Sequence, residues 1–278
     1  MSAQADKSHA RVNVYQFVVQ NPLNLLLLFM PVSIVLSFME ASKLWIFLAA
    51  ALSIIPLAGL IGQATEEISE YVGPGIGGFL NATFGNATEL IISLFALNAG
   101  LFEVVKASIS GSIIGNILLV LGASMLAGGW GRDKQKFNRT NAGANASMLL
   151  LAVVALVMPA VFDLVRYGTL QVANAPADIR QLSLFVAVVL LLVYLASLVF
   201  SLKTHHAILQ PEVAEPPQRR LTKLDAMILL IIATVLTAFM AEELVGAIEV
   251  ATAKLGMTEF FVGVIVVAVI GNAAEHFT

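Results

Sequence analysis

Long apolar runs separated by short polar segments dominate the chain. Most of these uncharged runs reach the roughly 20 residues that a helix needs to cross a hydrocarbon core about 30 Å thick. Because backbone polar groups in lipid must be satisfied within each helix, their recurrence predicts an all-α polytopic membrane protein, whereas a β-barrel would show short alternating segments. We expect eight spans, at residues 17–39, 44–68, 76–99, 104–127, 142–162, 182–203, 225–249 and 258–278.

Composition agrees with this pattern and narrows the chemistry. Hydrophobic residues make up 59% of the chain and charged residues 12%, about half the share in a soluble domain. The absence of cysteine excludes disulfides and thiolate chemistry. A net charge of −3 argues against a nucleic-acid partner. The apolar runs indicate that the lipid bilayer surrounds the chain.

The distribution of lysine and arginine predicts an orientation. With the N-terminus inside, inner segments hold ten of these residues and outer loops hold five. This bias places the N-terminus and the polar segment His205–Arg220 in the cytoplasm, with the chain in the cytoplasmic (inner) membrane. The expected organisation is an N-terminal segment and first helix at 1–40, a first repeat at 41–203, a cytoplasmic linker at 204–223 and the start of a second repeat at 224–278.

Carboxylates stand where lipid is expected. Glu89 is the single charge near the middle of the third span, and Glu275 is the single carboxylate of the eighth. A charge at the bilayer centre costs about 2.5–3.5 kcal/mol on insertion scales, so such residues usually face a cavity and have a function. The alternative is that protonated or hydrogen-bonded glutamates only hold the helices together. Paired glutamates also occur in the second and seventh spans, as Glu66 with Glu67 and Glu242 with Glu243.

The two central glutamates belong to an internal repeat. Gly85–Glu89 reads GNATE and Gly271–Glu275 reads GNAAE, and in the preceding helices Ala64–Ile68 (ATEEI) resembles Met240–Leu244 (MAEEL). The third span runs outward and the eighth runs inward, so the repeats are predicted to be inverted. Secondary transporters build a midplane site between repeats of this kind.

The residue types around the motifs favour a hard cation. Asn81, Gly85, Glu89 and Ser93 are spaced by four, with Asn86 on the adjoining edge, and glycine permits local unwinding that frees carbonyl oxygens. Calcium takes six to eight oxygen ligands, whereas zinc or copper would favour His and Cys. Two carboxylates would neutralise either Ca²⁺ or protons, and this competition would produce exchange.

Two further features have open interpretations. His276 points about 100° away from Glu275 around a helix, so it either titrates during transport or packs through a hydrogen bond. In the fourth span, Ser108, Ser112 and Asn116 stand at spacing four beside Gly111 and Gly115. This pattern indicates either a face of small residues for helix packing or a lining of the ion path.

These motifs resemble the calcium/proton exchangers of the cation/calcium exchanger superfamily. The resemblance rests on GNATELIISLFAL (85–97), GSIIGNILLVLG (111–122), ATEEI (64–68) and GNAAEH (271–276). It implies an inverted-repeat antiporter fold of eleven helices, about eight of which are present here, so a chain truncated within the eighth helix is expected. It implies Glu89 and Glu275 as Ca²⁺ and H⁺ ligands, with Asn86 and Asn272 beside them. Glu66, Glu67, Glu242, Glu243 and His276 would flank the ion path, with no cofactor required.

Several alternatives remain at this point. A sodium/calcium exchanger uses a related inverted-repeat scaffold, and the histidine after the second motif favours protons instead. A cation channel is a second alternative, but two separated carboxylates on inverted repeats suit an occluding site better than a continuous pore. No His-Glu-x-x-His or Gly-x-Ser-x-Gly pattern supports a membrane enzyme. A non-transporting fragment and association into homo-oligomers are both left open.

Overall fold

The computed structural model describes residues 13–134, 137–168, 170, 175–200 and 220–276, and every regular element within them is helical. They form two compact units, one built from the parts of the chain before Lys134 and after Pro216, the other lying between these positions. The first unit contains these elements: α1 (Val14–Gln20), η1 (Pro22–Leu28), α2 (Phe29–Phe38), α3 (Lys43–Val72), α4 (Pro74–Phe84), α5 (Ala87–Asn98), α6 (Phe102–Gly115), η2 (Asn116–Val120), α7 (Leu121–Gly129), α11 (Lys223–Val245), α12 (Ile248–Leu255), α13 (Glu259–Phe261), η4 (Val262–Val267) and α14 (Ala268–His276).

The helices are long and apolar enough to cross a membrane at the predicted places. Five qualify as single helices, and the number among the described residues rises to eight when each of three bent pairs is taken as one span. The eight predicted spans therefore correspond to observed helices. Their ends differ by several residues, since a helix can continue beyond the apolar run that predicts it.

The first predicted span is bent, which the sequence pattern did not predict. The α1 helix meets the η1–α2 segment at 102°. The bend falls at Asn21 and Pro22, where proline supplies no N–H and the Asn21 side chain accepts a hydrogen bond from the Leu23 N–H. The continuous helix expected at 17–39 is therefore wrong. At the other end of the chain, α12 and the segment Glu259–Asn272 form an angle of 110°.

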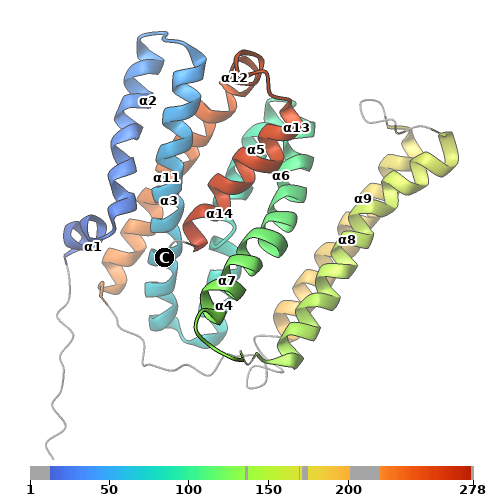
Figure 1. The fold of residues 1–278 in the computed structure, drawn as a ribbon, viewed down its shortest axis with the longest axis horizontal. Helices are drawn as coiled ribbons and strands as arrows, with labels where there is room; N and C mark the ends of the chain where they lie inside the picture. Colours follow the sequence, from blue (N-terminus) through green and yellow to red (C-terminus); the bar gives the residue numbers. More distant parts are fainter. Residues whose placement is uncertain (1–12, 135–136, 169, 171–174, 201–219, 277–278) are drawn as a thin grey trace, which may run out of the picture. The chain divides into compact units, whose positions relative to one another are not determined.

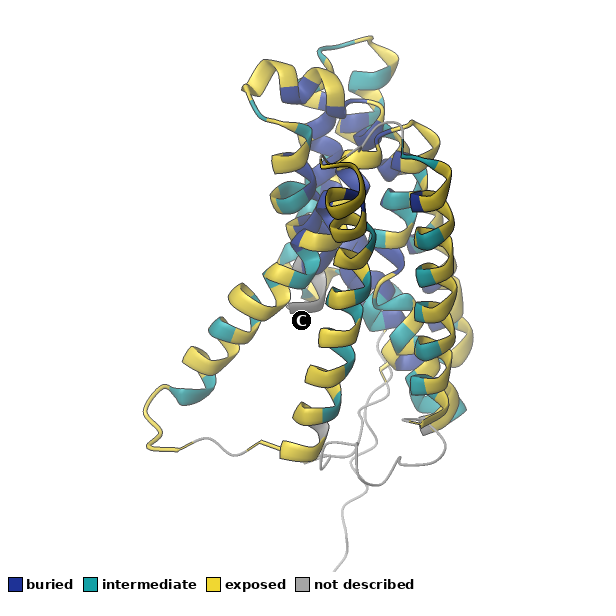
Figure 2. Ribbon diagram, turned by 90° about the vertical axis from the view of Figure 1, so that its right-hand side faces the viewer, coloured by how far each residue is buried: buried dark blue, intermediate teal, exposed yellow. Residues whose placement is uncertain are grey.

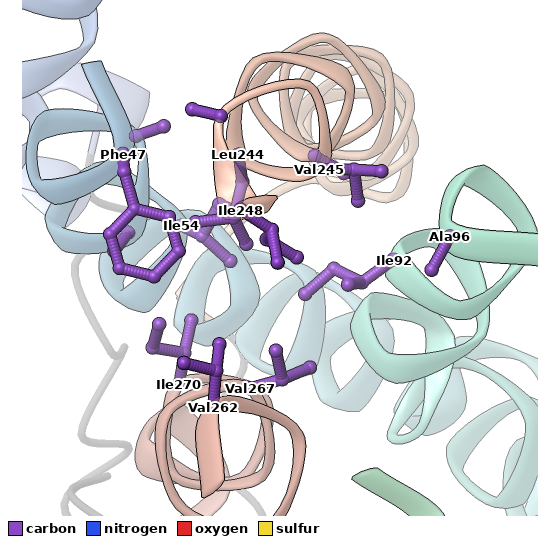
Figure 3. Close-up of a cluster of buried hydrophobic side chains, with 14 of the residues drawn as sticks. Phe47, Ile54, Ile92, Ala96, Leu244, Val245, Ile248, Val262, Val267 and Ile270 are labelled. Atoms are coloured by element: carbon purple, nitrogen blue, oxygen red, sulfur yellow. The ribbon is translucent and has the colours of Figure 1, made fainter. Parts of the chain in front are cut away.

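The α3 helix forms the centre of the first unit. Over the apolar part of this helix, 67% of the residues are buried inside the protein. Phe47 and Ile54 pack there against Leu244 of α11 and Ile270 of α14, so residues far apart in the sequence share one apolar cluster (Figure 3). Buried positions are concentrated in this interior, and exposed positions cover the outward faces of the helices (Figure 2).

Corresponding segments of the two repeats run in opposite directions. In Figure 1, α3 and α11 lie side by side and antiparallel, and the pair α4–α5 runs opposite to α13–α14. The predicted inversion of the repeats is therefore present in the fold. The α4–α5 span is broken by 41° at Gly85 and Asn86, within the first repeated motif.

The second unit is a helical hairpin of α8 (Arg139–Tyr167) and α9 (Ala177–Val199). The Tyr167 hydroxyl donates to the Asp178 carboxylate at 2.8 Å and joins the two helices near the turn. Only 6% and 0% of the residues in their apolar parts are buried inside the protein. Helices that are apolar on all sides and exposed in this way are suited to contact with lipid.

Candidate functional site

Glu89 lies at the start of α5, directly after the break in the third span, and its carboxylate reaches the second repeated motif. A Cβ atom built on Gly271 of α14 would lie 2.7 Å from Glu89 Oε1 and 2.8 Å from Glu89 Cδ. Only a residue without a side chain permits this approach. The contact places the acidic end of one motif against the first residue of the other, and it joins the two repeats in the interior.

The asparagines of the two motifs make corresponding hydrogen bonds. Asn86 Nδ2 donates to the carbonyl oxygen of Ala82 at 3.4 Å, and Asn272 Nδ2 donates to that of Ala268 at 2.9 Å. In both, the amide nitrogen is used one turn back along the chain, so Oδ1 is the atom that could coordinate a cation. Asn272 is buried and Asn86 is exposed, so the correspondence does not extend to burial.

The fourth span contributes both a packing face and a contact with the site. A Cβ on Gly111 would lie 2.7 Å from Val264 Cα, and a Cβ on Gly263 would lie 2.7 Å from the Val104 carbonyl oxygen. The backbones of α6 and η4 therefore touch at two glycines. On the same helix, Ser112 Oγ accepts a hydrogen bond of 3.1 Å from Asn272 Nδ2. The sequence left Ser112 with two interpretations, a face for helix packing or a lining of the ion path, and it did not predict the bond to Asn272.

The break in the third span divides the predicted polar stripe. Asn81 lies on α4, and its Oδ1 is 3.2 Å from Ser69 Oγ of α3. Glu89 lies on α5 and contacts α14 instead. A spacing of four along an unbroken helix would have put both side chains in one row, and the 41° change of direction separates them.

The two acidic pairs have different members exposed and packed. Glu66 and Glu242 are exposed, whereas Glu67 is buried and Glu243 is half-buried. The Glu67 carboxylate accepts hydrogen bonds from the backbone N–H groups of Arg220 and Leu221, each at 3.1 Å. Glu243 Oε1 accepts a hydrogen bond of 3.1 Å from Ser37 Oγ.

The structure places the backbone of Glu275 and His276 in α14, one helical turn beyond Gly271. Their side chains lie outside what the structure describes, so the predicted roles of these two residues stay predictions. Within the described side chains, no three His, Asp or Glu residues converge as a metal-binding group. Near the contact between Glu89 and Gly271, the described side chains with oxygen atoms that could bind a cation are those of Glu89, Asn272 and Ser112.

Replacement of Gly271 by alanine tests the contact with Glu89. The new methyl group would overlap the end of a flexible side chain rather than backbone, so the Glu89 carboxylate would move and the helices would stay. We expect a near-wild-type melting temperature together with a roughly tenfold weaker apparent affinity for Ca²⁺, the cation that the sequence predicts. Ion-flux titration and thermal unfolding in detergent measure these effects. Unchanged affinity would show that the position of Glu89 relative to Gly271 is unimportant.

The chain is similar to known proteins over most of its length. The family model described as "Sodium/calcium exchanger protein" matches residues 42–203 and 226–278. The Ca²⁺/H⁺ antiporter of Aphanothece halophytica is 43% identical over 270 residues, covering 91% of this chain and 70% of that protein. The Ca²⁺/H⁺ antiporter ChaA of Bacillus subtilis is 41% identical, covering 88% of this chain and 69% of that protein. The solved structure of native YfkE superposes with a TM-score of 0.74 at 38% identity, covering 91% of this chain and 70% of that one.

Proposed function

Because this chain belongs to the sodium/calcium exchanger protein family, and within it to the calcium/proton exchangers, we propose that it exchanges Ca²⁺ for H⁺ across a membrane by alternating access. The observation that carries the proposal is the contact between the Glu89 carboxylate and Gly271. It brings the two GNA motifs, one from each inverted repeat, to a single place. Transporters with inverted repeats bind their ions at such a place.

The exchange follows from competition at the carboxylates. Glu89 and Glu275 bind either Ca²⁺, with their charges neutralising the ion, or protons, which neutralise the same charges. Amide and hydroxyl oxygens supply the further hard ligands that Ca²⁺ needs, and Asn86, Asn272 and Ser112 are the candidates. A site that must be neutral to move through the membrane accepts one cargo at a time, since an unneutralised carboxylate pair is costly in a low dielectric.

The exposed members of the acidic pairs mark the ion path. Glu66 lies near the end of α3 and Glu242 near the end of α11, and these ends face opposite sides because the helices are antiparallel (Figure 1). An exposed carboxylate on each side would attract cations to the central site. With the N-terminus in the cytoplasm, Glu66 would serve the cytoplasmic side and Glu242 the outer side of the cytoplasmic membrane.

Flux measurements in sealed vesicles test this function. With the protein reconstituted and a pH gradient imposed, acidic inside, we expect Ca²⁺ uptake against its own gradient that a protonophore abolishes. Vesicles without the protein serve as the control. Uptake driven by a sodium gradient and unaffected by pH would identify a sodium/calcium exchanger. Calcium flow only down its own gradient, without counter-movement of protons, would identify a channel and overturn the proposal.

A further inference from the structure

The ends of α3 and α11 are connected by hydrogen bonds that the ion path does not require. The two helices make the most extensive helix–helix contact of the first unit and run antiparallel (Figure 1). Each carries a glutamate pair within its last two turns, at 66–67 on α3 and 242–243 on α11. In each pair, the second glutamate reaches the segment that leads into the other helix.

At the C-terminal end of α3, Glu67 holds the chain that enters α11. Both of its carboxylate oxygens accept backbone hydrogen bonds, from Arg220 N at 3.1 and 3.2 Å and from Leu221 N at 3.1 Å. One turn further along α3, the Tyr71 hydroxyl donates to the Leu221 carbonyl oxygen at 2.7 Å. Leu221 is itself 1% exposed, so its backbone polar groups depend on partners inside the protein. The α11 helix starts two residues later, at Lys223.

At the C-terminal end of α11, Glu243 holds the chain that enters α3. Its Oε1 accepts a hydrogen bond from Ser37 of α2, six residues before α3 begins. The same end of the unit has a second connection, because Lys254 Nζ of α12 lies 2.9 Å from the Oγ of Ser42, the residue directly before α3. Each long helix is therefore tied, at its end, to the entry of its counterpart.

We propose that Glu67 and Glu243 are positioning residues that fix the entries of α11 and α3, and that only their neighbours Glu66 and Glu242 act in the ion path. This proposal divides each acidic pair by role. To bind a cation, the Glu67 carboxylate would have to abandon the amide hydrogens of Arg220 and of the buried Leu221, and a buried N–H without a partner is costly. Glu66 and Glu242 are exposed, and among the described residues neither accepts backbone hydrogen bonds as Glu67 does.

Two measurements test the roles of Glu67 and Glu66: hydrogen–deuterium exchange, which does not depend on the proposed function, and Ca²⁺ flux, which rests on it. In Glu67→Ala, the amide hydrogens of Arg220 and Leu221 lose their acceptor. We expect their exchange with deuterium, measured by mass spectrometry of the peptide that contains them, to become about tenfold faster. This measurement needs no transport. In flux assays, the same variant should have a lower maximal rate of Ca²⁺ uptake and an unchanged KM for Ca²⁺.

The neighbouring glutamate is the matched control. Glu66→Ala should leave the hydrogen–deuterium exchange of the Arg220 and Leu221 amides at the wild-type rate, and it should raise the KM for Ca²⁺. Glu67→Gln keeps one acceptor oxygen and should restore most of the protection and most of the rate lost in Glu67→Ala. Should Glu67→Ala fail to fold, Tyr71→Phe removes one bond to the same segment and should give a smaller increase in exchange.

Two outcomes would overturn the assignment. One is wild-type exchange of Arg220 and Leu221 in Glu67→Ala, which would show that the carboxylate does not hold them. The other is a raised KM for Ca²⁺ in both Glu67→Ala and Glu67→Gln, which would place Glu67 in the ion path. A failure of all Ca²⁺ transport in the unaltered protein would instead count against the proposed function. The hydrogen–deuterium exchange of Arg220 and Leu221 would then decide by itself whether Glu67 holds this segment.

Discussion

Replacing Glu89 by glutamine is expected to abolish Ca²⁺ uptake driven by a pH gradient. Glutamine has nearly the same shape but carries no charge, so it can neither neutralise Ca²⁺ nor take up and release the exchanged proton. The loss of one carboxylate from a site that must balance a divalent ion should cost about 3 kcal/mol or more, which corresponds to a decrease of roughly 100-fold in affinity. Initial rates of Ca²⁺ uptake in vesicles measure the effect.

Glu103→Gln is the matched control for Glu89→Gln. Glu103 stands near the start of α6 in an exposed pair with Lys106, at 3.3 Å. An exposed pair contributes little, so this variant should fold and transport like the unaltered protein. Substantial proton-driven uptake by Glu89→Gln would remove Glu89 from the site, whatever the result for Glu275.

Replacing Gly111 by alanine is expected to cause the largest loss of stability among single methyl additions. The new Cβ would lie within 2.8 Å of both Cα and the carbonyl carbon of Val264, and backbone atoms cannot rotate away as a side chain can. Overpacking of this kind costs about 1–3 kcal/mol, and we expect a value near the upper end. The melting temperature in detergent should fall by roughly 10 °C.

The same helix provides the control for this variant. A Cβ on Gly115, one turn further along, meets nothing within 4 Å. Gly115→Ala should therefore be neutral or slightly stabilising, because alanine favours a helix by about 0.5–1 kcal/mol over glycine. Equal melting temperatures for the two variants would show that α6 and η4 are not in backbone contact at Gly111.

Much of the fold could be predicted because its signals are local. A run of about 20 apolar residues indicates a span whatever surrounds it, and the eight predicted spans are all found in the helices. The inversion of the repeats followed from counting the spans between two motifs. The glycine in the first motif indicated local unwinding, and α4 does end just before Gly85.

The features that sequence reasoning missed depend on contacts between distant residues. The spacing of Ser108 and Ser112 is that of a packing face, and only the position of α14 shows that Ser112 bonds to Asn272. The hydrogen bonds of Glu67 join positions more than 150 residues apart. A neighbouring pair of glutamates in the sequence therefore gave no sign that one member is exposed and the other is buried.

For the candidate site, the sequence predicted which two segments meet but could not specify the contacts. The motifs at 85–89 and 271–275 were expected to meet, and Gly271 does contact the Glu89 carboxylate. Which atoms touch was not predictable, because it depends on the 41° break and on the close packing of η4 against α6. The roles of Glu89, Glu275, Asn86 and Asn272 as ion ligands stay predictions, as do the places of the acidic pairs beside the ion path.

The two glycine contacts between α6 and η4 limit how these helices can move. When backbones interlock at Gly111 and Gly263, a shift along the helix axis would drive side chains into the spaces that only glycine leaves open. Steric overlap therefore prevents α6 and η4 from sliding past each other, and the two helices behave as one rigid unit. Asn272, which follows η4 and bonds to Ser112 of α6, is thereby held at a fixed position relative to α6.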